Sequence, residues 1–225
     1  QKGDSVSPLT NGFQLIGFPV GVLSSKTTEG GVVFSSDNST LRNLQWTLDD
    51  AGFLGLSYDF RVYSQEFFDY FGVSFDYDES EVTALKWYGK GPYRVWKNRR
   101  KGVEMGIWQK AYIDTITWLS WDYPEFKGFH DDLHFALVQD ARINLEIVTE
   151  TPGLNLRVFT PSEAPDPANT RVSFPPGDLS FLHAIAPIGT KFKLATRHGP
   201  EGQPSWSHRG GQHFRATVYF RLVNP

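Results

Sequence analysis

The stretch Leu54-Gly-Leu-Ser-Tyr-Asp-Phe-Arg-Val-Tyr63 decides the fold class of this chain. Its apolar side chains fall at every second position, and a strand with one face on a core requires that period of two. The same alternation returns in Phe71-Gly-Val-Ser-Phe-Asp-Tyr77 and over residues 214–222. Further short runs of this character occupy residues 32–35, 44–48, 82–87, 102–108, 135–138, 143–149, 154–159 and 191–194. Strands at intervals of about ten residues, with turn residues between them, predict a large antiparallel β-sandwich.

Helical signals are weak along the whole chain. No window places apolar residues at helical spacing over several turns without an interrupting glycine or proline, so we expect an all-β fold with little helix. Residues 160–177 contain five prolines and are predicted to form a loop. That loop is compatible with a boundary between two domains or with a crossover inside one. Because neither half has a composition of its own, we expect one domain over residues 1–225.

Composition excludes several classes of protein. The 225 residues are 40% hydrophobic and 21% charged, which is incompatible with a disordered chain, and no apolar run approaches the roughly 18 residues of a membrane span. The absence of cysteine removes disulfide scaffolds, zinc–thiolate sites, iron–sulfur clusters and cysteine nucleophiles. A formal net charge of −3 provides no overall field for nucleic acid or an anionic membrane. We therefore expect neither nucleic acid nor a membrane as a partner.

Charge is distributed unevenly along the chain. Residues 37–81 carry ten acids and two bases, whereas residues 86–110 carry eight bases and one acid. Two neighbouring surfaces that pair with each other would explain this, and so would a basic patch that binds a ligand. Aromatic residues make up 15% of the chain and many lie in polar, turn-rich stretches, which favours a ligand that stacks on rings.

The densest group of such residues is Lys86-Trp-Tyr-Gly-Lys-Gly-Pro-Tyr-Arg-Val-Trp-Lys-Asn-Arg-Arg-Lys101. A Gly-Lys-Gly-Pro turn is expected to follow the strand. The candidate binding residues after that turn are Tyr93, Arg94, Trp96, Asn98 and Arg99. Rings that stack on sugar faces, next to guanidinium and amide donors, are typical of glycan recognition. Nucleic acid would use the same residue types, but the acidic flanks argue against it. A structural alternative places Trp87 in the core and uses Arg94 and Arg99 to anchor a loop.

A second dense segment, residues 112–130, combines rings with carboxylates. Its candidate sugar-binding rings are Trp118, Trp121 and Tyr123, and Glu125 follows them. Paired carboxylates would suit glycoside hydrolysis, but two acids so close in sequence are common by chance. The spacing therefore assigns no catalytic residue.

Histidines and carboxylates occur together directly after this segment. His130, Asp131, Asp132 and His134 have side chains that bind metals, but their spacing matches no known metal motif, so no metal is predicted. The chain also has no serine nucleophile elbow, no His-Glu-x-x-His and no dinucleotide fingerprint. No cofactor is therefore expected.

A third segment, residues 198–213, is rich in glycine and holds three histidines, one arginine and one tryptophan. Trp206 lies in this polar stretch, just before the last predicted strand. A ring in such a place is expected to be an exposed platform at the rim of the sandwich.

The segment Val82-Thr-Ala-Leu-Lys-Trp-Tyr-Gly-Lys-Gly-Pro-Tyr-Arg-Val-Trp-Lys-Asn-Arg99 resembles the C-terminal small-chain domain of family 2 β-galactosidases. In that domain a strand ending in Trp-x-Gly-x-Gly-Pro leads to an aromatic residue and an Asp-Arg pair, and here Asn98 replaces the aspartate. Tyr123-Pro-Glu-Phe-Lys-Gly128 is similar to a later segment of the domain, and Pro204-Ser-Trp-Ser207 lies where the family has a loop with tryptophan. The resemblance covers roughly residues 50–225.

This resemblance implies a galactose mutarotase-like supersandwich, present as a C-terminal fragment of a larger carbohydrate-active enzyme. The expected partners are a saccharide ligand and the upstream catalytic domains of the same chain, in an extracellular or periplasmic bacterial location. In the family this domain supplies no catalytic carboxylate, and by that match Trp206 would face the sugar. Because residues 97–101 are almost wholly basic and Asn98 departs from the pattern, an acidic glycan bound by Arg94 and Arg99 is an alternative to a galactoside.

Three classes of function follow. The first is a non-catalytic carbohydrate-binding or accessory domain of a glycoside hydrolase. The second is an enzyme of its own, a mutarotase-like epimerase or polysaccharide lyase, with His130, His134 or His183 acting beside Glu125. The third is a purely structural packing domain. The residues predicted to bind saccharide are Trp206, Arg94, Trp96, Asn98, Arg99, Trp118, Trp121, Tyr123 and Glu125.

Overall fold

The computed structural model describes residues 14–16, 23–29, 31–36, 41–62, 67–68, 70–78, 80–111, 128–158, 175, 177–187, 206–207 and 212–225. The regular elements of these residues are all β-strands, and every pairing between them is antiparallel. The predicted all-β antiparallel fold is confirmed. Within the same residues we find no helix long and apolar enough to span a bilayer.

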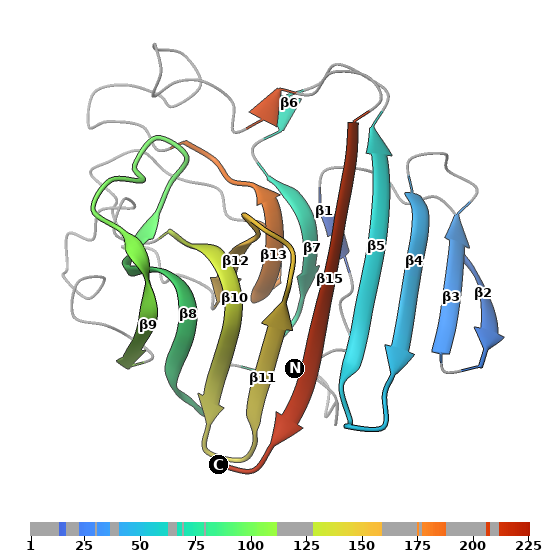
Figure 1. Ribbon diagram of the computed structural model, residues 1–225, viewed down its shortest axis with the longest axis horizontal. Coiled ribbons are helices and arrows are strands. Elements are labelled where there is room, and N and C mark those ends of the chain that lie inside the picture. Colours follow the sequence, from blue (N-terminus) through green and yellow to red (C-terminus); the bar gives the residue numbers. More distant parts are fainter. Residues whose placement is uncertain are drawn as a thin grey trace.

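The larger of two sheets, here called the large sheet, has the strand order β9-β8-β10-β11-β15-β5-β4-β3-β2 (Figure 1). Its strands are β2 (Leu23–Thr28), β3 (Gly31–Ser36), β4 (Leu41–Leu48), β5 (Leu54–Val62), β8 (Val82–Val95), β9 (Glu104–Ala111), β10 (Phe129–Asp140), β11 (Asn144–Thr149) and β15 (Gln212–Val223). Strand β15 lies in the middle of this sheet, between β11 and β5.

The small sheet packs against the large one and has the order β1-β7-β13-β12. Its strands are β1 (Gln14–Ile16), β7 (Phe71–Phe75), β12 (Asn155–Val158) and β13 (Leu179–Ala184). A separate two-stranded ladder joins β6 (Phe67–Phe68) to β14 (Trp206–Ser207). Strand β10 belongs to both sheets, because its residue His130 pairs with Leu156 of β12 whereas residues 135–138 pair with β11.

Aromatic rings fill the space between the sheets. The ring of Phe220 on β15 lies 5.8 Å from that of Phe75 on β7 and 5.5 Å from that of Phe181 on β13. A second, smaller core cluster includes Tyr70, Val95, Trp96, Phe129, Leu182 and Ile185. Since Phe181 and Leu182 are neighbours on one strand and point to opposite faces, the small sheet is covered on both sides.

The observed strand β8 corrects one sequence prediction. The Gly-Lys-Gly-Pro segment was expected to form a turn, but β8 runs without a break through Gly89, Gly91 and Pro92 to Val95. Its ladder with β9 extends as far as the pair Gly91 and Glu104, and the Gly91–Pro92 peptide bond is cis. The predicted strand at residues 191–194 and most of the predicted loop at 160–177 lie outside the described residues.

Candidate functional site

Two glycines of strand β8 lie where neighbouring groups leave no room for a side chain. A Cβ atom on Gly89 would lie 2.9 Å from the carbonyl oxygen of Asp132, and one on Gly91 would lie 2.5 Å from the indole ring of Trp108. The indole of Trp108 donates a hydrogen bond of 3.2 Å to the Gly89 carbonyl, and that of Trp87 donates one of 3.3 Å to the Lys90 carbonyl. The glycines of the motif therefore serve close packing inside a strand.

The group opposite Gly89 is a bulge in strand β10, residues 131–134. Asp131 pairs with Lys90 and Phe135 pairs with Tyr88, so the three residues between Asp131 and Phe135 lie opposite Gly89 alone. Asp132 has a φ of 52°, in the left-handed region that few non-glycine residues adopt. A bulge redirects side chains and bends its strand, and this one lies where β10 passes from the small sheet to the large sheet.

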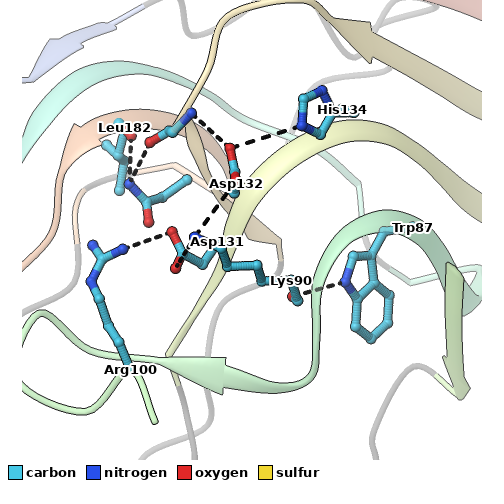
Figure 2. Close-up of polar contacts among 9 residues, drawn as sticks. Trp87, Lys90, Arg100, Asp131, Asp132, His134 and Leu182 are labelled. Carbon is cyan, nitrogen blue, oxygen red and sulfur yellow. Dashed lines mark hydrogen bonds and ion pairs between the residues drawn. The ribbon is translucent and has the colours of Figure 1, made fainter. Parts of the chain in front are cut away.

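The first carboxylate of the bulge, Asp131, is buried and held by two cations. Arg100 donates a hydrogen bond of 2.7 Å from Nη1 to Oδ1, and Lys90 Nζ lies 3.6 Å from Oδ2 (Figure 2). The side chain of Asp131 is 4% exposed, whereas that of Arg100 is 41% exposed. A carboxylate removed from water in this way needs such partners, because an unpaired buried charge is strongly unfavourable.

The second carboxylate, Asp132, lies nearer the surface and links three segments. Its Oδ1 accepts a 2.8 Å hydrogen bond from the backbone N–H of Gly153 and lies 3.9 Å from His134 Nε2, and its Oδ2 is 3.6 Å from Lys90 Nζ (Figure 2). The side chain of Asp132 is 23% exposed, and those of Lys90 and His134 are each 37% exposed. Two carboxylates and two cations thus give this group a formal charge of zero when His134 is neutral.

An exposed apolar surface adjoins these charges. The ring of Tyr88, which is 43% exposed, lies 5.5 Å from the imidazole of His134. Across the ladder from Tyr88 is Ile107 of β9, which is 70% exposed. The polar cluster and this apolar surface together form a candidate binding surface.

Two of the histidines considered for an enzymatic role are core residues. Burial, with smaller contributions from the charges of Arg94 and Lys110, lowers the pKa of His130 to about 3, and its ring lies 4.5 Å from that of Trp87. Burial also lowers the pKa of His183 to about 4, and its Nε2 lies 3.0 Å from the hydroxyl of Tyr58. Both imidazoles are therefore neutral near pH 7.

The predicted site residues on and after β8 lie in different environments. Arg94 is half-buried on the strand. Trp96 is fully buried with its ring edge-on to Phe129 at 5.3 Å, so the prediction that its ring binds saccharide is wrong. Asn98 and Arg99 lie in a tight turn, in which the Arg99 N–H donates 2.9 Å to the Trp96 carbonyl. The turn directly follows the buried indole of Trp96, which belongs to the second core cluster.

The other predicted binding residues lie outside, or only partly within, the part of the chain that the structure describes. Trp118, Trp121, Tyr123 and Glu125 lie outside the described residues. Trp206 begins strand β14 and pairs through its backbone with Phe68, while its side chain is outside the description. Their roles remain predictions.

Tyr88, Lys90 and Arg100 are the site residues that the sequence reading missed. Tyr88 and Lys90 are two positions apart on one strand, so their side chains share a face. The sequence pattern would have shown this if the predicted strand had extended beyond residue 87 through Gly89 and Gly91. Asp131 and Asp132 were considered only as metal ligands. No group of three or more histidine and acidic side chains among the described residues is arranged to hold a metal ion.

Comparison with known proteins assigns the chain to a family. A family model described as the beta galactosidase small chain matches residues 20–196, a range that includes β8 and the bulge and ends before Trp206. None of the curated proteins matches the chain. Among solved structures, the crystal structure of the GalM/aldose epimerase homologue from C. elegans aligns with a TM-score of 0.38 and 10% sequence identity, over 90% of this chain and 68% of that one. The resemblance inferred from the Trp-x-Gly-x-Gly-Pro motif is confirmed, and the chain belongs to the beta-galactosidase small-chain family.

Proposed function

We propose that this chain is a non-catalytic accessory domain of a multidomain glycoside hydrolase of the β-galactosidase type, and that it offers that enzyme a surface for saccharide. The observation that carries the proposal is the family match over residues 20–196, which covers most of both sheets. A domain of this family is expected to act next to a separate catalytic domain.

The carboxylates of the bulge support a non-catalytic role. Hydrolysis of a glycosidic bond uses two carboxyl groups that flank the bond on a bound substrate. Asp131 is buried beneath Arg100 and Lys90, so its oxygens do not reach the surface where a substrate would lie. Only Asp132 of this pair is open to a ligand.

The exposed rings support contact with saccharide. Tyr88 and Tyr93 both project from β8 into solvent. A pyranose has an apolar face of C–H groups and a rim of hydroxyls, and exposed tyrosines beside charged groups match both parts. Trp206 is a further candidate through the family resemblance.

Titration of the purified chain with neutral and acidic oligosaccharides tests this proposal, with tryptophan fluorescence and calorimetry as readouts. We expect binding of saccharide, no hydrolysis of nitrophenyl galactosides and no acceleration of anomer interconversion followed by NMR. Hydrolysis or faster interconversion would establish an enzyme in its own right. Absence of binding to every saccharide would leave a structural packing domain.

A further inference from the structure

Four side chains from two strands converge on the outer face of the large sheet at the bulge. Tyr88 and Lys90 are two positions apart on β8 and share a face, while Asp132 and His134 come from β10. Lys90 Nζ lies 3.6 Å from Asp132 Oδ2, His134 Nε2 lies 3.9 Å from Asp132 Oδ1, and the rings of His134 and Tyr88 are 5.5 Å apart. All four keep exposed surface.

The apolar side of this group extends across the ladder to β9. Ile107 pairs with Tyr88 and Met105 pairs with Lys90, and both apolar side chains are exposed. Tyr88, Ile107 and Met105 therefore form a continuous apolar shelf beside the charged groups. A shelf of this kind suits the C–H face of a sugar ring.

The polar side offers both kinds of hydrogen-bonding partner. Asp132 accepts, Lys90 donates, and the His134 imidazole can do either, which fits neighbouring hydroxyls that donate and accept at once. The Asp132 carboxylate is held in place by the Gly153 N–H, and its backbone is fixed against Gly89. Groups already held in position lose little freedom when a ligand binds.

The balanced charge of the site favours neutral sugars over acidic ones. Lys90 and Arg100 are matched by Asp131 and Asp132, so these four groups together leave no net positive charge to attract a uronate or a phosphate. Asp132, the more exposed carboxylate, would repel an acidic sugar directly. A neutral hexose meets no such penalty.

We infer that Tyr88, Lys90, Asp132 and His134 form a binding subsite for a neutral pyranose, with Tyr88 and Ile107 beneath the ring and Asp132, Lys90 and His134 at its hydroxyls. Figure 2 shows the three polar members of this subsite. This inference rests on the proposed saccharide-binding function and assigns it to residues distinct from Trp206 and from the turn at Asn98 and Arg99.

The test measures binding of methyl β-galactopyranoside and of galacturonate, a neutral and a charged form of one ring, by calorimetry and NMR. We expect the wild type to bind the neutral sugar, with shifts in the His134 ring signals, and to bind galacturonate several times more weakly. Tyr88→Ala and Asp132→Asn are each expected to lower the affinity about tenfold, or about 1.4 kcal/mol. Asparagine tolerates the left-handed backbone of position 132, so that variant keeps its fold.

Leu48→Ala is the matched control, because Leu48 is an exposed apolar residue of the same sheet, 65% exposed, on strand β4, which is separated from β8 by β10, β11, β15 and β5. It is expected to keep its affinity. If the wild type binds the galactoside while Tyr88→Ala and Asp132→Asn bind it equally well, or while the His134 signals do not move, the subsite is wrong and the proposed function survives. Tighter binding of galacturonate would overturn the preference for a neutral sugar. Absence of all saccharide binding would overturn both proposals.

Discussion

Gly89 lies against the backbone of Asp132, and a Cβ atom on Gly89 would be 2.9 Å from the Asp132 carbonyl oxygen and 3.2 Å from that of Asp131. The obstacle is backbone rather than a flexible side chain, so the bulge itself would have to move. The absence of a side chain at Gly89 thus lets the bulge that carries the two carboxylates lie directly against β8.

Gly89→Ala is therefore expected to destabilise the fold by about 1–3 kcal/mol, the usual cost of overpacking a close contact. Urea unfolding followed by circular dichroism measures this. Lys86→Ala, an exposed change on the same strand, should alter the free energy of unfolding by no more than about 0.5 kcal/mol. Equal stability of Gly89→Ala and wild type would show that the bulge can shift freely.

Arg100→Ala should destabilise the protein by about 1–3 kcal/mol, because it leaves the buried Asp131 carboxylate with Lys90 as its remaining described cation. The matched control is Arg215→Ala, since Arg215 Nε is also 2.7 Å from an aspartate, Asp59, but Arg215 is 69% exposed. An exposed pair contributes about 0–1 kcal/mol. Equal losses in thermal unfolding would contradict a special role for the buried pair.

Trp96→Ala is expected to cost about 3–5 kcal/mol of stability, as large-to-small changes of buried tryptophans do. Saccharide affinity of the folded fraction should not change, because the indole lies in the second core cluster. Chemical denaturation together with calorimetric titration distinguishes the two effects. A stable variant with weakened binding would restore Trp96 to the binding surface.

Trp206→Ala is expected to have the opposite effect to Trp96→Ala, a change in saccharide affinity rather than in stability. If Trp206 faces the sugar as the family resemblance implies, its loss should weaken saccharide binding by about 1–3 kcal/mol, by analogy with aromatic stacking on bases. Trp46→Phe is a useful comparison, because Trp46 packs between Phe75 and Phe220 and should affect stability alone. Unchanged affinity in Trp206→Ala would assign that tryptophan a structural role.

Stability is expected to fall as the pH drops below about 6.5. The pKa values of His130 and His183 in the folded protein are about 3 and about 4, below the ordinary 6.5, so unfolding takes up protons across this range. Each imidazole lowers the free energy of unfolding by about 1.4 kcal/mol for every pH unit below 6.5, until the pH reaches its pKa in the folded protein. The free energy of unfolding at pH 7 and pH 5 checks this, and His183→Gln should reduce the difference. A pH-independent free energy would contradict the buried neutral state.

The strands were predictable because alternation is a local property. Consecutive side chains of a strand point to opposite faces whatever the rest of the chain does. The period-two pattern that includes Tyr58 and Phe60 therefore identified β5 correctly, and the same pattern identified β7. The bulge was not predictable in this way. Its existence depends on the register between β8 and β10, which are separated in sequence and meet only in the folded protein.

Local composition also led to two wrong predictions, one for the Gly-Lys-Gly-Pro segment and one for Trp96. Gly-Lys-Gly-Pro has the residues of a turn, yet Gly89 and Gly91 lie inside a strand because Asp132 and Trp108 occupy the space of their missing side chains. Trp96 precedes a run of basic residues and was predicted to bind saccharide, which would require its ring to be exposed. Its burial depends on the distant residues Phe129 and Leu182, which no local pattern reveals.

The position of β15 between β11 and β5 has a consequence for how the protein is made. Strand β5 is synthesised long before its partner, since the contact between Asp59 and His213 spans 154 residues. Until β15 leaves the ribosome, the edges of β5 and β11 lack the strand that separates them, and such open edges invite association with other nascent chains. Closure of the sandwich is therefore a late and slow event, and a chain stalled before residue 212 would depend on chaperones to stay unaggregated.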